Sequence, residues 1–188
     1  NAISNVKEIA IYTTKIAGGY GALSKSIEGA EDSFDDGEEV IIDEKIKQSD
    51  VVIGISASGS AKFVLGALSK AFELGAYTCL ITFNSFNEND SYIKDIISYN
   101  LGPEIISGST RMKAGTATKM ILNMISTTAM IKSNKVYKNY MVDLKVSNEK
   151  LKDRAINIIS DITKLDIIKS SSLLKLAKND VKVALVMN

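Results

Sequence analysis

Residues 50–60 read Asp50-Val51-Val52-Ile53-Gly54-Ile55-Ser56-Ala57-Ser58-Gly59-Ser60, and this stretch decides the fold. Its first half is an apolar, β-branched run with the length and composition of a buried strand. Its second half is a turn of small and hydroxyl-bearing residues. Apolar residues then recur at helical spacing from Ala61 to Leu74, and Gly75 follows as a stop signal. The stretch therefore predicts a strand, a serine-rich turn and a helix in direct succession.

The same alternation continues on both sides of this stretch. We expect further strands at residues 8–13, 77–83 and 95–99, which gives a sheet of about four strands. We expect helices over residues 22–33 and 110–132, and an acidic turn over residues 35–39. Strands that alternate with helices at this spacing indicate an α/β fold with a parallel sheet covered by helices. Right-handed crossovers would place ligand-binding loops at the carboxyl ends of the strands.

The C-terminal part of the sequence is predicted to be helical. Ser147 or Asn148 can cap a helix with a clean apolar stripe, and further helices are expected from residues 170–177 and over 181–187. A connection over residues 139–146 precedes them. We therefore expect one domain over residues 1–146 and a C-terminal helical segment over residues 147–188.

Composition excludes several classes of protein. The net charge is +1, which gives no basic field for nucleic acid. The apolar runs are too short to span a bilayer. The chain has no histidine, so histidine-dependent catalysis and histidine-containing metal sites are excluded. Its single cysteine, Cys79, lies in an apolar run and cannot form an internal disulfide, which favours a reducing cytoplasm.

The serine-rich turn is the first candidate site. Ser56, Ser58 and Ser60 follow a strand directly, and small residues allow a ligand to approach the backbone closely. Amides and hydroxyls in such a turn can surround phosphate oxygens. The alternative is an ordinary turn that caps the next helix.

Two acidic residues form the second candidate site. Glu28 and Glu31 lie three residues apart, so on a helix they would share one face. Repulsion between them, together with partial burial, would raise a carboxyl pKa into a range useful for general acid–base catalysis. The alternative is a solvated acidic helix end that continues into Asp35 and Asp36.

The third candidate site lies in residues 107–119, after the only proline of the chain. Ser109 or Thr110 can cap the long helix, whose amino end favours an anion. Arg111 and Lys113 are cations placed against the helix dipole, which suggests a negatively charged ligand. The alternative is a capped helix with solvated cations. Nucleotide-binding glycine motifs are absent from the sequence, so a sugar phosphate suits the segment better than a nucleotide.

Taken together, these segments resemble the N-acetylmuramic acid 6-phosphate etherases, a branch of the sugar isomerase (SIS) fold. The resemblance covers nearly the whole chain and keeps its motifs in order. It is carried by residues 16–19, 28–33, 50–55, 107–117, 122–127, 141–143 and 148–151. It implies a three-layer, flavodoxin-like SIS domain that binds a phosphosugar.

The resemblance also implies an activity. Etherases of this family cleave the lactyl ether of N-acetylmuramic acid 6-phosphate to N-acetylglucosamine 6-phosphate and D-lactate, with carboxylates as acid and base and without metal or cofactor. Glu31 matches a catalytic acid–base position, and Glu28 matches a neighbouring acid that contacts the sugar. Ser56, Ser58 and Ser60 fall on the phosphate loop. Ser109, Thr110 and Lys113 fall on a segment near the sugar. We expect a homodimer in the cytoplasm that binds neither nucleic acid nor membranes.

Two departures from the family pattern bear on these expectations. Family members carry an upstream strand with a Gly-Ala-Gly-Thr-Ser-Gly-Arg loop and a second catalytic glutamate. We expect this chain to lack both and therefore to be inactive on its own. The phosphate loop of the family reads Ala-Ser-Gly-Arg-Thr-Pro-Tyr, whereas residues 57–63 lack the arginine and the threonine. The pattern of Ser60, Ala61 and Phe63 is closer to the glucokinase regulatory proteins, which bind fructose phosphates without catalysis. A phosphosugar-binding regulatory module and a sugar-phosphate isomerase therefore stay open as alternatives.

Overall fold

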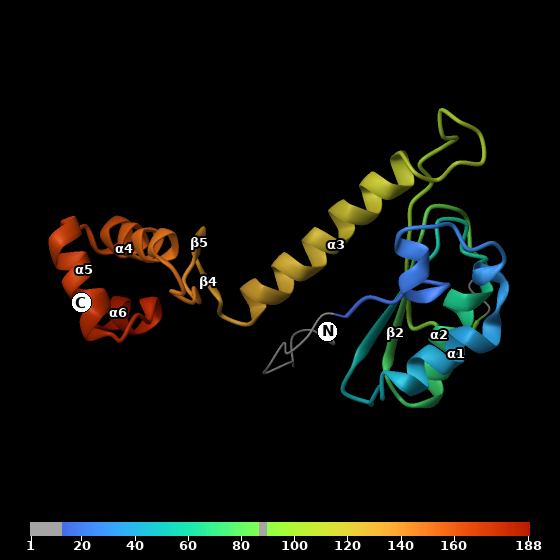
Figure 1. Ribbon diagram of the computed structural model, residues 1–188, viewed down its shortest axis with the longest axis horizontal. Coiled ribbons are helices and arrows are strands. Elements are labelled where there is room, and N and C mark those ends of the chain that lie inside the picture. The colour runs from blue at the N-terminus through green and yellow to red at the C-terminus, as the bar shows by residue number, and fades with distance from the viewer. Residues whose placement is uncertain (1–12, 87–89) are drawn as a thin grey trace. The chain divides into compact units, whose positions relative to one another are not determined.

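The computed structural model describes residues 13–86 and 90–188 (Figure 1). The described chain divides into two compact units, one up to Met124 and the other from Ile125 to Asn188. These units are not the segments expected as domains, 1–146 and 147–188, and that expected division stays a prediction. None of the helices in the described ranges is long and apolar enough to cross a membrane.

Among the described residues, the first unit contains a three-stranded parallel sheet. Its strands are β1 (Val51–Ile55), β2 (Tyr77–Thr82) and β3 (Asp95–Ser98), in the spatial order β1-β2-β3. The register pairs Val51 with Tyr77 and Cys79 with Asp95. The parallel α/β architecture is thereby confirmed. The strand expected over residues 8–13 lies outside the described residues, apart from its last position.

One face of the sheet is covered by α2 (Lys62–Glu73), which confirms the helix expected after the serine-rich turn. Gly54 allows this contact, because a Cβ atom there would lie 2.6 Å from Val64 Cγ1 and 2.8 Å from Leu68 Cδ1. Leu68 is fully buried. The strand before the turn and the helix after it are therefore packed directly on each other.

A second helix, α1 (Phe34–Asp43), packs against α2. The two helices approach at Gly37 and Gly66, where an added Cβ atom would lie about 2 Å from a backbone oxygen of the other helix. Ile41 and Ala71 form a small core beside this crossing. Close approach of backbones, rather than interdigitated large side chains, therefore joins α1 to α2.

The prediction for residues 22–39 is wrong. In place of a helix over residues 22–33 the chain forms two short 3-10 helices, η2 (Gly19–Leu23) and η3 (Ala30–Asp32). Gly29 has a φ of 73°, which interrupts any continuous helix. The expected acidic turn is the start of α1, where the Ser33 side chain accepts a hydrogen bond from the Asp36 amide. Acids in a first helical turn are stabilised by the helix dipole, so this acidic cluster marks a helix start.

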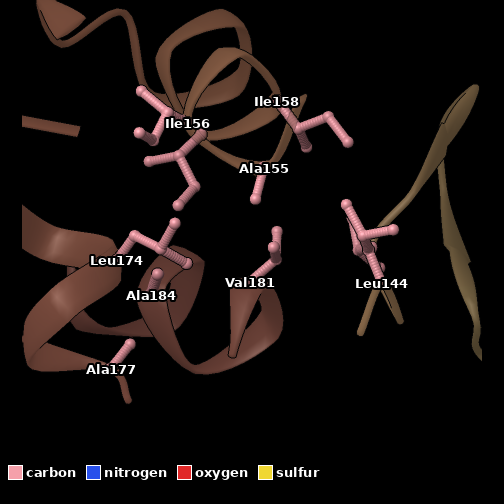
Figure 2. Close-up of a cluster of buried hydrophobic side chains, with 10 residues drawn as sticks. Leu144, Ala155, Ile156, Ile158, Leu174, Ala177, Val181 and Ala184 are labelled. Atoms are coloured by element: carbon pink, nitrogen blue, oxygen red, sulfur yellow. The ribbon is translucent and has the colours of Figure 1, made fainter. Parts of the chain in front are cut away.

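The second unit has its own core (Figure 2). After α3 (Lys113–Lys132), a short hairpin of β4 (Val136–Tyr137) and β5 (Tyr140–Met141) leads to three helices. These are α4 (Glu149–Thr163), α5 (Ile167–Leu176) and α6 (Val181–Met187). Aliphatic side chains from all three helices meet in a buried cluster, together with two residues that follow the hairpin. Its members are Val142, Leu144, Ala155, Ile156, Ile158, Ile159, Leu174, Ala177, Val181 and Ala184.

Most sequence predictions for this unit are confirmed. The Asn148 side chain caps α4 by accepting a hydrogen bond from the Leu151 amide, and α6 has the expected bounds. Helix α5 begins at Ile167, three residues before the expected start, because Asp166 serves as its cap. Asp143 follows the hairpin and pairs with Lys135 at 2.5 Å and with Lys182 of α6 at 3.1 Å.

Candidate functional site

The serine-rich turn lies at the carboxyl end of β1, as the parallel topology requires. The Ser56 amide donates to the Ile81 carbonyl at 3.0 Å, and the Phe83 amide donates to the Ala57 carbonyl at 3.0 Å. These bonds extend the pairing of β1 with β2 into the turn. The turn is therefore anchored to β1 at its start and to α2 at its end.

Ser56 holds the turn together from within. Its hydroxyl oxygen accepts hydrogen bonds from the amides of Gly59, at 3.1 Å, and of Ala61, at 3.3 Å. The residue is only 6% exposed, and Gly59 has a φ of 79°, which favours glycine. Ser56 thus acts as the internal hydrogen-bond acceptor that shapes the backbone.

Ser58 and Ser60 face the solvent instead. Their hydroxyl oxygens lie 2.8 Å apart, and the Ser60 amide donates to the Ser58 hydroxyl oxygen at 3.2 Å. The N-cap of α2 is Ala61, which makes no side-chain cap bond. Two exposed hydroxyls thus stand beside a helix amino end without a side-chain cap, an arrangement suited to an oxyanion such as a phosphate monoester.

The two candidate acids are not on one helix face. Glu28 precedes Gly29, Glu31 lies in η3, and both side chains are exposed. The prediction that these two acids share one helix face is therefore wrong. The element that carries Glu31 nevertheless packs against α2, the helix that begins at the serine-rich turn. The catalytic assignment of Glu31 and the sugar contact of Glu28 stay predictions.

The long helix is capped differently from the prediction. Helix α3 begins at Lys113, and neither Ser109 nor Thr110 provides its cap. The Glu104 carboxylate accepts hydrogen bonds from the amides of Lys113 and Ala114, both at 3.0 Å. These two bonds, in that order, are the main reason why the pKa of Glu104 lies below its ordinary value.

Lys113 is also committed to contacts within the chain. Its Nζ donates to the carbonyl oxygens of Leu101, at 3.2 Å, and of Pro103, at 2.8 Å. A substrate contact by this lysine, and those by Ser109 and Thr110, stay predictions. Sequence reasoning missed Glu104, because a side chain that caps a helix nine residues further on leaves no local pattern in the sequence.

The single cysteine, Cys79, is buried. Burial, with a smaller contribution from Asp95, raises the pKa of Cys79 to about 11, so its thiol is protonated at neutral pH. Across residues 13–86 and 90–188, no cluster of three acids or cysteines could hold a metal ion.

Comparison with known proteins adds two family matches. Residues 2–72 match the glucokinase regulatory protein N-terminal SIS domain, and residues 138–183 match the C-terminal lid domain of glucokinase regulatory protein. The first match contains the serine-rich turn, and the second contains α4 and α5.

Individual relatives that match nearly the whole of this chain point to a more specific group of proteins. An N-acetylmuramic acid 6-phosphate etherase from Oceanobacillus iheyensis is 49% identical over 172 residues, which are 92% of this chain and 58% of that protein. The chain is therefore similar to N-acetylmuramic acid 6-phosphate etherases over more than nine-tenths of its own length. Another etherase, from Pseudothermotoga lettingae, is 49% identical over 94% of this chain and 59% of its own length. The etherase from Gloeobacter violaceus is 44% identical over 173 residues, which are 92% of this chain and 56% of that protein. The chain thus spans somewhat more than half the length of these etherases.

Proposed function

We propose that this chain forms the phosphosugar-binding part of an etherase that acts on N-acetylmuramic acid 6-phosphate. Sequence identity of 44–49% to several etherases, over more than nine-tenths of the chain, carries this proposal. The products would be N-acetylglucosamine 6-phosphate and D-lactate, and the reaction class is a carbon–oxygen lyase. The enzyme would work on an amino sugar released in cell-wall recycling, in the cytoplasm.

The phosphate group would bind at the serine-rich turn. Ser58 and Ser60 offer exposed hydroxyls, and the first amides of α2 lie directly behind them in the chain. Hydroxyl and amide donors to a phosphate dianion make charge-assisted hydrogen bonds, about twice as strong as neutral ones. Ser56 would contribute indirectly, since its hydroxyl oxygen already organises the turn.

Glu31 would supply acid–base chemistry, with Glu28 beside the sugar. A base removes the proton from C2 of the opened sugar, next to the C1 carbonyl, and these electrons form the C2=C3 double bond. The bond between C3 and the ether oxygen breaks, and lactate leaves with that oxygen and gains a proton. Water then adds its oxygen to C3 while a proton returns to C2. A carboxylate that alternates between base and acid can serve these steps.

The decisive experiment is an assay of D-lactate release from N-acetylmuramic acid 6-phosphate. Glu31→Gln should abolish release from an active protein while product binding persists. The matched control is Glu39→Gln, since Glu39 is an exposed glutamate of α1 that has no proposed role. Equal turnover in the two variants would remove Glu31 from the mechanism. Absence of lactate release from an etherase that contains this phosphosugar-binding part would contradict the proposed activity.

A second candidate is a regulatory module that binds phosphosugars without catalysis. Both family matches describe parts of the glucokinase regulatory protein, and Ser60, Ala61 and Phe63 follow the pattern of that protein. Calorimetric binding of fructose 6-phosphate without lactate release would favour this candidate. Lactate release would exclude it.

The proposed assembly is a homodimer with a sugar phosphate as its small-molecule partner. Sedimentation equilibrium should give a mass of about twice 20.3 kDa. A mass that stays at the monomer value across the accessible concentration range would contradict this assembly.

A further inference from the structure

We propose that Glu104 and Lys113 form a clasp that positions the loop of residues 105–112 for the sugar, an inference that rests on the proposed function. Glu104 is a positioning residue in this account, because it acts through the loop and the start of α3. The clasp consists of the two hydrogen bonds to the Glu104 carboxylate and the two from Lys113 Nζ.

The four bonds join the two ends of one loop. Leu101, Pro103 and Glu104 stand before it, and Lys113 and Ala114 stand after it. Each bond crosses from one side to the other, and each involves a charged group. Charged donors and acceptors strengthen such bonds relative to neutral pairs. The base of the loop is therefore closed by side chains from both of its ends.

The loop itself exposes its large apolar side chains. Ile105 is 85% exposed, Ile106 is 69% exposed and Met112 is 59% exposed. Among the described residues, a hydrogen bond from the Ser109 amide to the Ile106 carbonyl, at 3.0 Å, closes a turn inside the loop, and Gly108 has a φ of 81°. Compact loops with adjoining ends are frequent carriers of function. The clasp would limit the conformations of the loop of residues 105–112 before a ligand binds.

The clasp also decides where an anion can bind. The first amides of α3 already donate to the Glu104 carboxylate, so a phosphate would have to displace a charged group of the chain itself. The amino end of α2 has no side-chain cap, and it carries the exposed serine hydroxyls. The phosphate therefore belongs at the serine-rich turn, while the loop serves the uncharged part of the sugar.

This division predicts different responses to two ligands. N-Acetylglucosamine 6-phosphate would need both the turn and the preformed loop, whereas inorganic phosphate would need only the turn. Loss of the clasp leaves part of the ordering of the loop to the binding step, which lowers affinity without changing the contacts made. Loss of the clasp should therefore weaken the binding of the sugar phosphate but not that of inorganic phosphate.

The test uses the full 188-residue chain. Glu104→Gln removes the charge that accepts the two amides, and Lys113→Met removes the other half of the clasp with little change in size. Glu149→Gln is the matched control, since Glu149 lies in the first turn of α4. Hydrogen exchange of residues 105–114 reports on the loop, and calorimetric titration gives the Kd for each ligand.

Both clasp variants should exchange faster over residues 105–114 and raise the Kd for N-acetylglucosamine 6-phosphate about tenfold, which is about 1.4 kcal/mol. Their Kd for inorganic phosphate should stay within twofold of the unmodified chain, and the control should change neither quantity. Unchanged exchange would overturn the inference, as would an equal loss of affinity for both ligands. If the unmodified chain binds no sugar phosphate, the proposed function fails first and the inference fails with it.

Discussion

The α1–α2 crossing offers a sharp test of how the serine-rich turn is positioned. Replacing Gly37 by alanine would place a Cβ atom 2.0 Å from the backbone oxygen of Phe63, and the same change at Gly66 would place one 2.1 Å from that of Phe34. Because carbon and oxygen atoms need more than 3 Å, roughly 1 Å of separation must open between the helices. Such backbone shifts cost about 1–3 kcal/mol or more.

The helix propensity of alanine offsets part of this cost, by about 1 kcal/mol relative to glycine. We therefore expect Gly37→Ala and Gly66→Ala to lower the free energy of unfolding by up to about 2 kcal/mol each. The control is Gly115→Ala in α3, where nothing described lies within 4 Å of the added Cβ atom. There only propensity acts, so this variant should gain up to about 1 kcal/mol.

Urea unfolding followed by circular dichroism measures all three variants under one condition. The reasoning predicts opposite signs for the crossing and for the control. Since α2 begins at the serine-rich turn, Gly66→Ala should also weaken the binding of a sugar phosphate. Stabilisation by Gly37→Ala comparable with that of Gly115→Ala would show that the helices do not approach as closely as described, and would refute the argument.

Three further predictions concern single side chains. Ser170 is fully buried, and its hydroxyl has no hydrogen-bond partner among the described residues. Ser170→Ala should therefore raise the free energy of unfolding by about 1 kcal/mol in urea melts, and a lower free energy of unfolding would contradict this. Hydrogen bonds from Lys135 and then Lys182 lower the pKa of Asp143, so its stabilisation is present above about pH 4 and disappears as the pH falls through the lowered pKa. Asp143→Asn should therefore reduce the loss of unfolding free energy that acid causes. The difference should be less than about 1 kcal/mol, because the ion pair is partly exposed, and an unchanged acid dependence would contradict this. Cys79, with its pKa raised to about 11, should react with a thiol reagent at pH 8 only as fast as the chain unfolds, and rapid labelling of the folded protein would exclude its burial.

Much of the sheet and its covering helix was predictable from the sequence. β1, β2 and α2 combine apolar patterns with clear end signals, and burial agrees with local preference in β2 and α2. The order of these elements also places the serine-rich turn at a strand end. That part of the candidate site follows from periodicity alone.

The errors have identifiable physical causes. The predicted helix over residues 22–33 neglects Gly29, whose left-handed conformation directly before η3 interrupts a continuous helix. The prediction of an acidic turn at residues 35–39 rests on composition, although acids directly after Ser33 are typical of a first helical turn. The predicted cap of α3 uses the nearest hydroxyls, but Glu104 reaches its amides across the loop. Contacts of that kind depend on where the chain returns, which no local pattern records.

The central claim is that the serine-rich turn binds the phosphate group of an amino-sugar phosphate. A titration of the isotope-labelled chain with N-acetylglucosamine 6-phosphate, followed by amide NMR shifts, tests it most directly. The account predicts saturable shifts that are largest at Ser58, Gly59 and Ser60 and in the first turn of α2, and no such shifts with N-acetylglucosamine. Shifts absent from the turn, or equal with the neutral sugar, would contradict the account.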